Sequence, residues 1–187
     1  MSSSKCHGCC VSLPEDFAGA FVWEWHDGSF DRARFDLTPN GWEVTGRHGD
    51  SRYVLQINHD HEPISLDATC GDKTCSLRRS ARGWRNEDDV LLPGSERARD
   101  LDLGWTAVTN SFPLRRLMSR RRSHGQFDVL MISLPDMTPH VVRQSYAREG
   151  DGAVWRYANQ TSGFSARLTV DKNGLVTDYP DLCSKRD

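Results

Sequence analysis

Residue types that recognise polar ligands are concentrated in one stretch, residues 102–117, which has the sequence DLGWTAVTNSFPLRRL. Thr109 and Asn110 can form hydrogen bonds with the local backbone. Arg115 and Arg116 carry planar guanidinium groups, which suit a carboxylate inside the fold or the polar head of a ligand. The residue types alone leave a structural role and a binding role equally open.

Cysteine and histidine are placed too loosely to predict a metal site. The sequence CHGCC at residues 6–10 offers thiolate and imidazole ligands for zinc or copper, and Cys70 and Cys75 are a candidate second pair. His59 and His61 could share one side of a strand, but no third ligand is evident. We therefore predict free thiols, a flexible cysteine-rich tail over residues 1–13, and neither a metal nor a cofactor.

Enzyme signatures and nucleic-acid signatures are both missing from the sequence. It contains no His-Glu-x-x-His pair, no Gly-x-Ser-x-Gly elbow, no phosphate-binding glycine loop and no dinucleotide fingerprint. Five arginines between residues 115 and 122 could grip phosphates, but no aromatic residues alternate with them. The formal net charge of −2 also argues against a dedicated nucleic-acid binder. An exposed charged loop is the usual explanation of such a run, and we predict no nucleic-acid partner.

The elements that must position these residues are mainly strands, because apolar residues recur with a period of two. Tyr53, Leu55 and Ile57 alternate with polar or smaller residues, and residues 164–170 do the same over a longer stretch. Asn173-Gly174 then provides the positive φ that a tight hairpin needs. The further predicted strands are residues 21–25, 42–47, 64–69, 75–79, 126–134, 141–147, 154–158 and 175–177.

Many short strands with frequent turns predict an all-β domain over residues 14–187, with little helix. A short helical turn is expected only over residues 114–122, after a corner at Pro113, and residues 87–101 are expected to form a charged loop. The chain of 187 residues shows neither an apolar run of membrane-spanning length nor a secretory signal, so we expect a cytoplasmic protein. Nothing in the sequence indicates an oligomeric state.

Four stretches occur in the same order in a family of bacterial domains named for glycolipid binding. Residues 109–117 (TNSFPLRRL) resemble its Thr-Asn-x-x-Pro-(Ile/Leu)-Arg-Arg-Leu signature, and Gly83-Trp84 resembles a Gly-Trp of a central strand. Gln144-Ser145-Tyr146 resembles its Gln-x-Tyr, and residues 164–180 resemble its closing hairpin. The resemblance runs from about residue 21 to residue 182.

The resemblance implies a fold similar to that of the carriers that move lipoproteins between bacterial membranes. That fold is a large antiparallel sheet curled into an open or incomplete β-barrel around an apolar hollow. The six tryptophans of the chain could either line such a hollow or fill it.

The function expected on this basis is non-enzymatic binding of a lipid or glycolipid in the hollow. The residues expected to contact the ligand are Trp105, Asn110, Arg115, Arg116, Gln144 and Tyr146. Arg116 could equally pair with Asp102 or Asp178 and hold the barrel shut. Two other functions stay open: an enzyme that acts on a sugar or lipid head group with Asp102 and Asp178 near the two arginines, and a protein-interaction module.

Overall fold

Fourteen strands in one sheet make up most of the computed structural model, which describes residues 17–150 and 152–186. The first seven are β1 (Gly19–Trp25), β2 (Phe30–Thr38), β3 (Gly41–His48), β4 (Ser51–Ile57), β5 (Pro63–Cys70), β6 (Lys73–Ser80) and β7 (Gly83–Arg85). The others are β8 (Asp100–Leu103), β9 (His124–Ile132), β10 (His140–Arg148), β11 (Val154–Asn159), β12 (Phe164–Val170), β13 (Val176–Tyr179) and β14 (Cys183–Arg186). A 3₁₀ turn, η1 (Ser95–Arg97), and one helix, α1 (Val108–Ser119), complete the described part of the chain. The expected tail at residues 1–13 lies outside the described residues.

The strands follow the order β7-β6-β5-β4-β3-β2-β1-β14-β13-β12-β11-β10-β9-β8. Neighbouring strands are antiparallel except β8 and β9, which are parallel. Because β1 pairs with β14, the two ends of the described chain meet in the middle of the sheet, and β7 and β8 form its edges. The predicted all-β fold, a large curled sheet that does not close, is confirmed.

The period-two pattern correctly located most of the strands. Tyr53, Leu55 and Ile57 of β4 are buried, and the residues between them are more exposed. The predicted hairpin at Asn173-Gly174 is also present, because β12 and β13 pair on either side of it. β2, β8 and β14 were not predicted, and β7, which carries Gly83-Trp84, lies at the edge of the sheet and not at its centre.

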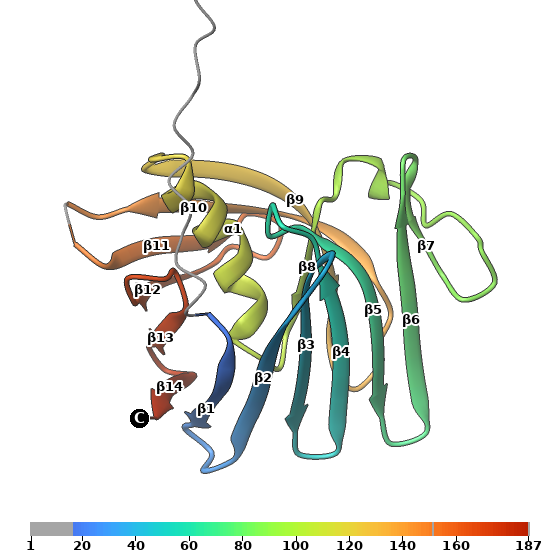
Figure 1. Ribbon diagram of the computed structural model, residues 1–187, viewed down its shortest axis with the longest axis horizontal. Helices are drawn as coiled ribbons and strands as arrows, with labels where there is room; N and C mark the ends of the chain where they lie inside the picture. The colour runs from blue at the N-terminus through green and yellow to red at the C-terminus, as the bar shows by residue number, and fades with distance from the viewer. Residues whose placement is uncertain (1–16, 151, 187) are drawn as a thin grey trace, which may run out of the picture.

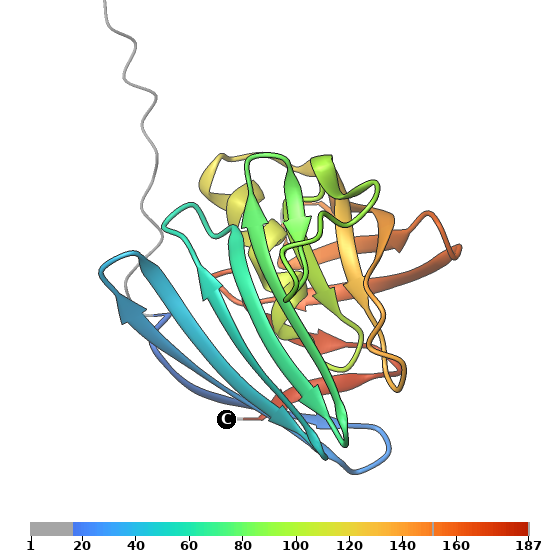
Figure 2. The ribbon, with the colours of Figure 1, turned by 90° about the vertical axis from the view of Figure 1, so that its right-hand side faces the viewer.

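The prediction for the helix was wrong in its position. α1 begins at Val108, six residues before the predicted turn, and Pro113 lies inside it instead of forming a corner. Residues 108–117 are all buried, because the sheet curls around the helix, as Figures 1 and 2 show. A helix that is buried on every side has no amphipathic stripe by which its sequence could reveal it.

Three of the tryptophans are packed inside the sheet. Trp23, Trp84 and Trp155 are at most 1 % exposed. The indole N–H of Trp23 donates to the carbonyl oxygen of Val176, and that of Trp84 donates to Ala98, both at 2.8 Å. These side chains and α1 therefore occupy the interior that the resemblance suggested could be hollow. Within the described residues, no helix is both long enough and apolar enough to cross a membrane.

Candidate functional site

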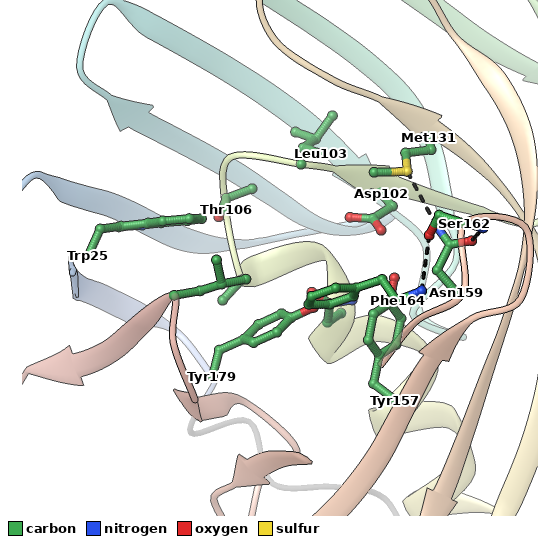
Figure 3. A pocket seen from close by; sticks show the side chains of 14 residues that line it. Trp25, Asp102, Leu103, Thr106, Met131, Tyr157, Asn159, Ser162, Phe164 and Tyr179 are labelled. Atoms are coloured by element: carbon green, nitrogen blue, oxygen red, sulfur yellow. Dashed lines mark hydrogen bonds between the residues drawn. The ribbon is translucent and has the colours of Figure 1, made fainter. Parts of the chain in front are cut away.

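A cavity of about 160 Å³ lies between α1, β8 and the C-terminal strands (Figure 3). Its wall contains four aromatic side chains together with hydroxyl, amide and carboxyl groups. The lining residues are Trp25, Asp102, Leu103, Gly104, Thr106, Ala107, Asn110, Met131, Tyr157, Asn159, Ser162, Phe164, Tyr179 and Leu182. They come from segments at both ends of the chain, so the curl of the sheet is what brings them together.

Asp102 supplies the carboxyl group of this wall, and β8 holds it there. Its Oδ2 accepts a hydrogen bond from Gln144 Nε2 at 2.6 Å, and its Oδ1 accepts one from Thr109 Oγ1 at 3.3 Å. Burial raises the pKa of the Asp102 carboxyl, and the hydrogen bonds from Gln144, Thr109 and Tyr157 oppose that effect. Neutral donors, and no cation, therefore hold this acid at the cavity.

A chain of buried amide and hydroxyl groups connects Asp102 to α1. Asn110 Nδ2 donates to the hydroxyl of Tyr146 at 3.0 Å, and that hydroxyl donates to Gln144 Oε1 at 3.2 Å. Gln144 in turn donates to Asp102. Each member fixes the orientation of the next, so the carboxylate has a defined direction before any ligand arrives.

Thr106 joins the cavity to a second buried acid. Its hydroxyl donates to Asp31 Oδ2 at 2.5 Å and accepts from the backbone N–H of Val108 at 3.1 Å, in the first turn of α1. The hydroxyl oxygen of Tyr53 lies 3.2 Å from the hydroxyl oxygen of Thr106. This arrangement fixes the beginning of α1 against β2 and β4, and so fixes the position of Asn110 in the cavity wall.

Aromatic rings line the side of the cavity that faces the C-terminal strands. The ring of Tyr157 lies 6.2 Å from the rings of both Phe164 and Tyr179. Phe164 is 46 % exposed, so this ring reaches solvent. On the β1 side, Trp25 stacks on His48 at 4.8 Å, and its indole N–H has no hydrogen-bond partner among the described residues. Figure 3 shows the tyrosines and Phe164 gathered below Asp102, with Trp25 further away beyond Thr106.

The residues expected to contact a ligand divide into two groups. Asn110 lines the cavity, and Gln144 and Tyr146 connect it to Asp102 by the hydrogen bonds described above. Trp105 is buried beside the wall residues Gly104 and Thr106, and its backbone oxygen contacts His48 Nδ1 at 2.7 Å.

The two arginines of this set lie away from the cavity, held by other parts of the fold. Arg115 is buried over the ring of Phe17 at 3.7 Å and donates to the backbone oxygen of Asn173; burial lowers its pKa to about 10. Arg116 pairs with Asp100 at 2.5 Å, so the expectation that it pairs with Asp102 or Asp178 was wrong.

The carboxylates suggested for an enzyme do not share the cavity. Asp102 lines it, whereas Asp178 accepts a hydrogen bond from Ser184 Oγ at 2.6 Å. Asp178 directly precedes Tyr179 on β13, and neighbouring residues of a strand point to opposite faces. Tyr179 faces the cavity, so Asp178 faces away from it.

The metal candidates stay apart as well. Among residues 17–150 and 152–186, no group of three or more His, Cys, Asp or Glu side chains could hold a metal ion. Cys70 and Cys75 are free thiols, and His59 is exposed, with its Nε2 near the Pro39 backbone oxygen. The residues at 6–10 lie outside the described part.

Sequence reasoning did not identify the aromatic wall. Phe164 and Tyr179 belong to the matched closing hairpin, and Tyr157 shares the buried face of β11 with Trp155, so the pattern gave no reason to separate the three from ordinary core residues. One signal was available: Phe164 lies at the end of its alternating row, where a strand side chain is less covered. Its exposure gives the cavity an aromatic rim.

The comparisons with known proteins agree with this architecture. The profile of a family described as "Putative glycolipid-binding" matches residues 20–185. A crystal structure of a DUF1089 family protein from Pseudomonas aeruginosa is similar with a TM-score of 0.65 and 27 % sequence identity. The match covers 81 % of this chain and 90 % of that one. No curated protein matches the chain.

Proposed function

The chain belongs to the family described as putative glycolipid-binding, and we propose that it binds a glycolipid through the sugar head group. One sugar ring occupies the cavity beside Asp102, and the lipid part extends past Phe164 to the outside. The protein holds this ligand without transforming it.

The observation that carries the proposal is a carboxylate held by neutral donors opposite a wall of aromatic rings. A sugar ring has apolar C–H faces, which suit the rings of Tyr157 and Tyr179, and hydroxyl groups at its edge. The carboxyl group of Asp102 and the amide of Asn110 offer hydrogen-bonding atoms to such hydroxyl groups. A ligand that carries hydroxyl groups therefore uses Asp102 and Asn110, and aromatic contacts set its orientation.

The size of the cavity favours a head group over an acyl chain. Ligand pockets for drug-sized molecules usually measure about 300–1,000 Å³. The cavity of about 160 Å³ is closer to an engineered cavity of roughly 150 Å³ that takes up a single benzene ring. We therefore place one ring in the cavity and leave the acyl chain outside the filled interior.

Native mass spectrometry of gently purified protein comes first, because a retained ligand adds a mass that disappears on denaturation. Isothermal titration with a panel of hexyl glycosides, each below its micelle concentration, then measures binding directly. We expect saturable binding of at least one glycoside, and at least fivefold weaker binding by the Phe164→Ser variant.

Phe30→Ser is the matched control, because Phe30 is 38 % exposed and does not line the cavity. It should bind like the wild type. Asp102→Asn keeps the shape of the side chain and replaces one carboxyl oxygen by an amide group, and it should also weaken binding. The proposal is wrong if no glycoside in the panel binds, or if Phe164→Ser and Phe30→Ser bind equally well.

A further inference from the structure

Three exposed arginines stand side by side on the outer face of the sheet, on the strands β2, β3 and β4. Arg32 pairs directly with Arg47, and Arg47 pairs directly with Arg52. Directly paired residues project from the same face, and neighbouring strands lie roughly 4.8 Å apart. The three guanidinium groups therefore form a continuous row across the sheet, which we call the arginine row.

The arginine row is left without carboxylate partners, although acids lie nearby. The neighbouring acids already bind other arginines: Asp36 pairs with Arg34, Asp67 with Arg78, and Glu24 with Arg186. Within the described residues, no ion pair involves a member of the row. Like charges placed directly opposite each other destabilise a sheet, so this row costs stability that an anionic partner would restore.

A shallow groove runs along the arginine row. It has a volume of about 380 Å³, and its lining combines the row with Arg34 and with small or apolar residues. Those residues are Ala20, Phe21, Val22, Ala33, Thr45 and Gly46. Phe30 is 38 % exposed, and the centre of its ring lies 5.1 Å from the guanidinium carbon of Arg32. Ala20 and Val22 pair directly with Arg34 and Arg32, so the surface is cationic with the apolar side chains of Ala20, Val22 and Phe30 on the same face.

We propose that this face docks on the surface of an anionic lipid bilayer, with the arginine row bound to lipid phosphates. Guanidinium groups form paired hydrogen bonds with phosphate oxygens, and the apolar residues between them suit the boundary between head groups and acyl chains. Figure 2 shows β2–β6 as a broad, open face with α1 on its other side, which matches an extended flat partner.

A nucleic acid fits this face less well. Single-stranded nucleic acids bind by stacking successive bases on several aromatic side chains, whereas the ring that lies against the arginine row is that of Phe30. The docking surface is also separate from the cavity, because the two share no lining residue. The experiments on membrane docking and on glycolipid binding therefore test two separate proposals, and one can be wrong while the other holds.

Co-sedimentation with vesicles tests the proposal. The vesicles contain phosphatidylcholine with about one-third phosphatidylglycerol, which gives a strongly anionic surface. We expect the wild type to bind these vesicles and to be released from them by salt. The triple variant R32Q/R47Q/R52Q should bind about a hundredfold more weakly, since each arginine near such a surface contributes about fivefold.

The matched control is R99Q/R143Q/R167Q, which removes the same charge from arginines that pair with Glu62, Asp128 and Glu149. It should bind the vesicles within a fewfold of the wild type. Equal binding by the two triple variants, or no preference of the wild type for anionic vesicles, overturns the proposal. It is also overturned if single-stranded DNA binds as tightly as the vesicles and with the same dependence on the arginine row.

Discussion

Asp31 is a residue whose burial has a measurable consequence for stability. It is completely buried, Thr106 donates to one of its oxygens, and the other oxygen has no partner among the described residues. Burial raises its pKa to about 6, against the opposing effect of the Thr106 hydrogen bond. Ionisation of Asp31 near neutral pH therefore lowers the stability of the folded protein.

We predict that Asp31→Asn stabilises the protein above pH 6 but not at pH 4. An acid whose pKa is raised on folding holds its proton more tightly in the folded state. Its contribution to the free energy of unfolding therefore falls as pH rises from about 4, the unfolded value, to the folded value. A difference of about two pKa units corresponds to about 3 kcal/mol.

Urea unfolding at several pH values gives the free energy of unfolding of the wild type and of Asp31→Asn. The contributions of the other titrating groups cancel in the difference between the two proteins. Asparagine keeps the shape of the side chain and still accepts the Thr106 hydrogen bond. A difference in the free energy of unfolding that stays constant between pH 4 and pH 7 would contradict the prediction.

At the scale of elements, β8 shows where sequence reasoning fails. Its sequence is Asp-Leu-Asp-Leu, and all four residues are buried. Asp100 is neutralised by Arg116 and Asp102 is held by Gln144, and both partners are distant in the sequence. Two aspartates in four residues predict a loop unless those partners are known, whereas β4 and β12 were predictable because their pattern is local.

The hairpin between β12 and β13 gives a prediction about a glycine. Gly174 has φ +77°, and a Cβ there would lie 2.9 Å from the Cγ of the buried Arg115. Gly28 has a similar φ of +80° but open space around it. We expect Gly28→Ala to cost about 1 kcal/mol for its backbone conformation alone, and Gly174→Ala to cost about 2 kcal/mol more because Arg115 must move.

Thermal and urea unfolding of the two variants against the wild type measure this difference. Equal losses of stability would show that Arg115 gives way freely. That result would mean that the closing hairpin and α1 are packed less tightly than described.

At the scale of the whole molecule, the filled interior decides which part of a ligand can enter. α1 and three buried tryptophans lie inside the curl of the sheet, and a cavity of about 160 Å³ lies beside them. Whether the sheet was hollow or filled could not be read from the sequence, because aromatic residues at strand spacing fit both cases. The cavity itself combines residues from β1 to β13, so its composition was equally hidden.

We predict that lengthening the alkyl chain of a bound glycoside adds little affinity. Each methylene buried in an apolar interior contributes about 0.8 kcal/mol, so an enclosed chain would gain about fifteenfold between hexyl and octyl glycosides. With the chain outside, the gain should be less than about threefold. Titration of the two glycosides below their micelle concentrations separates these cases, and a fifteenfold gain would mean that the interior opens for the chain.

The pairing of β1 with β14 also has a consequence for how the protein is made. Val22 pairs with Arg186, which leaves the ribosome about 160 residues later. At a synthesis rate of about 5–20 residues per second, the free edge of β1 waits of order ten seconds or more for its partner. An unpaired strand edge can pair with other chains and start aggregation. The nascent protein therefore passes through a stage at which a chaperone could cover the free edge of β1.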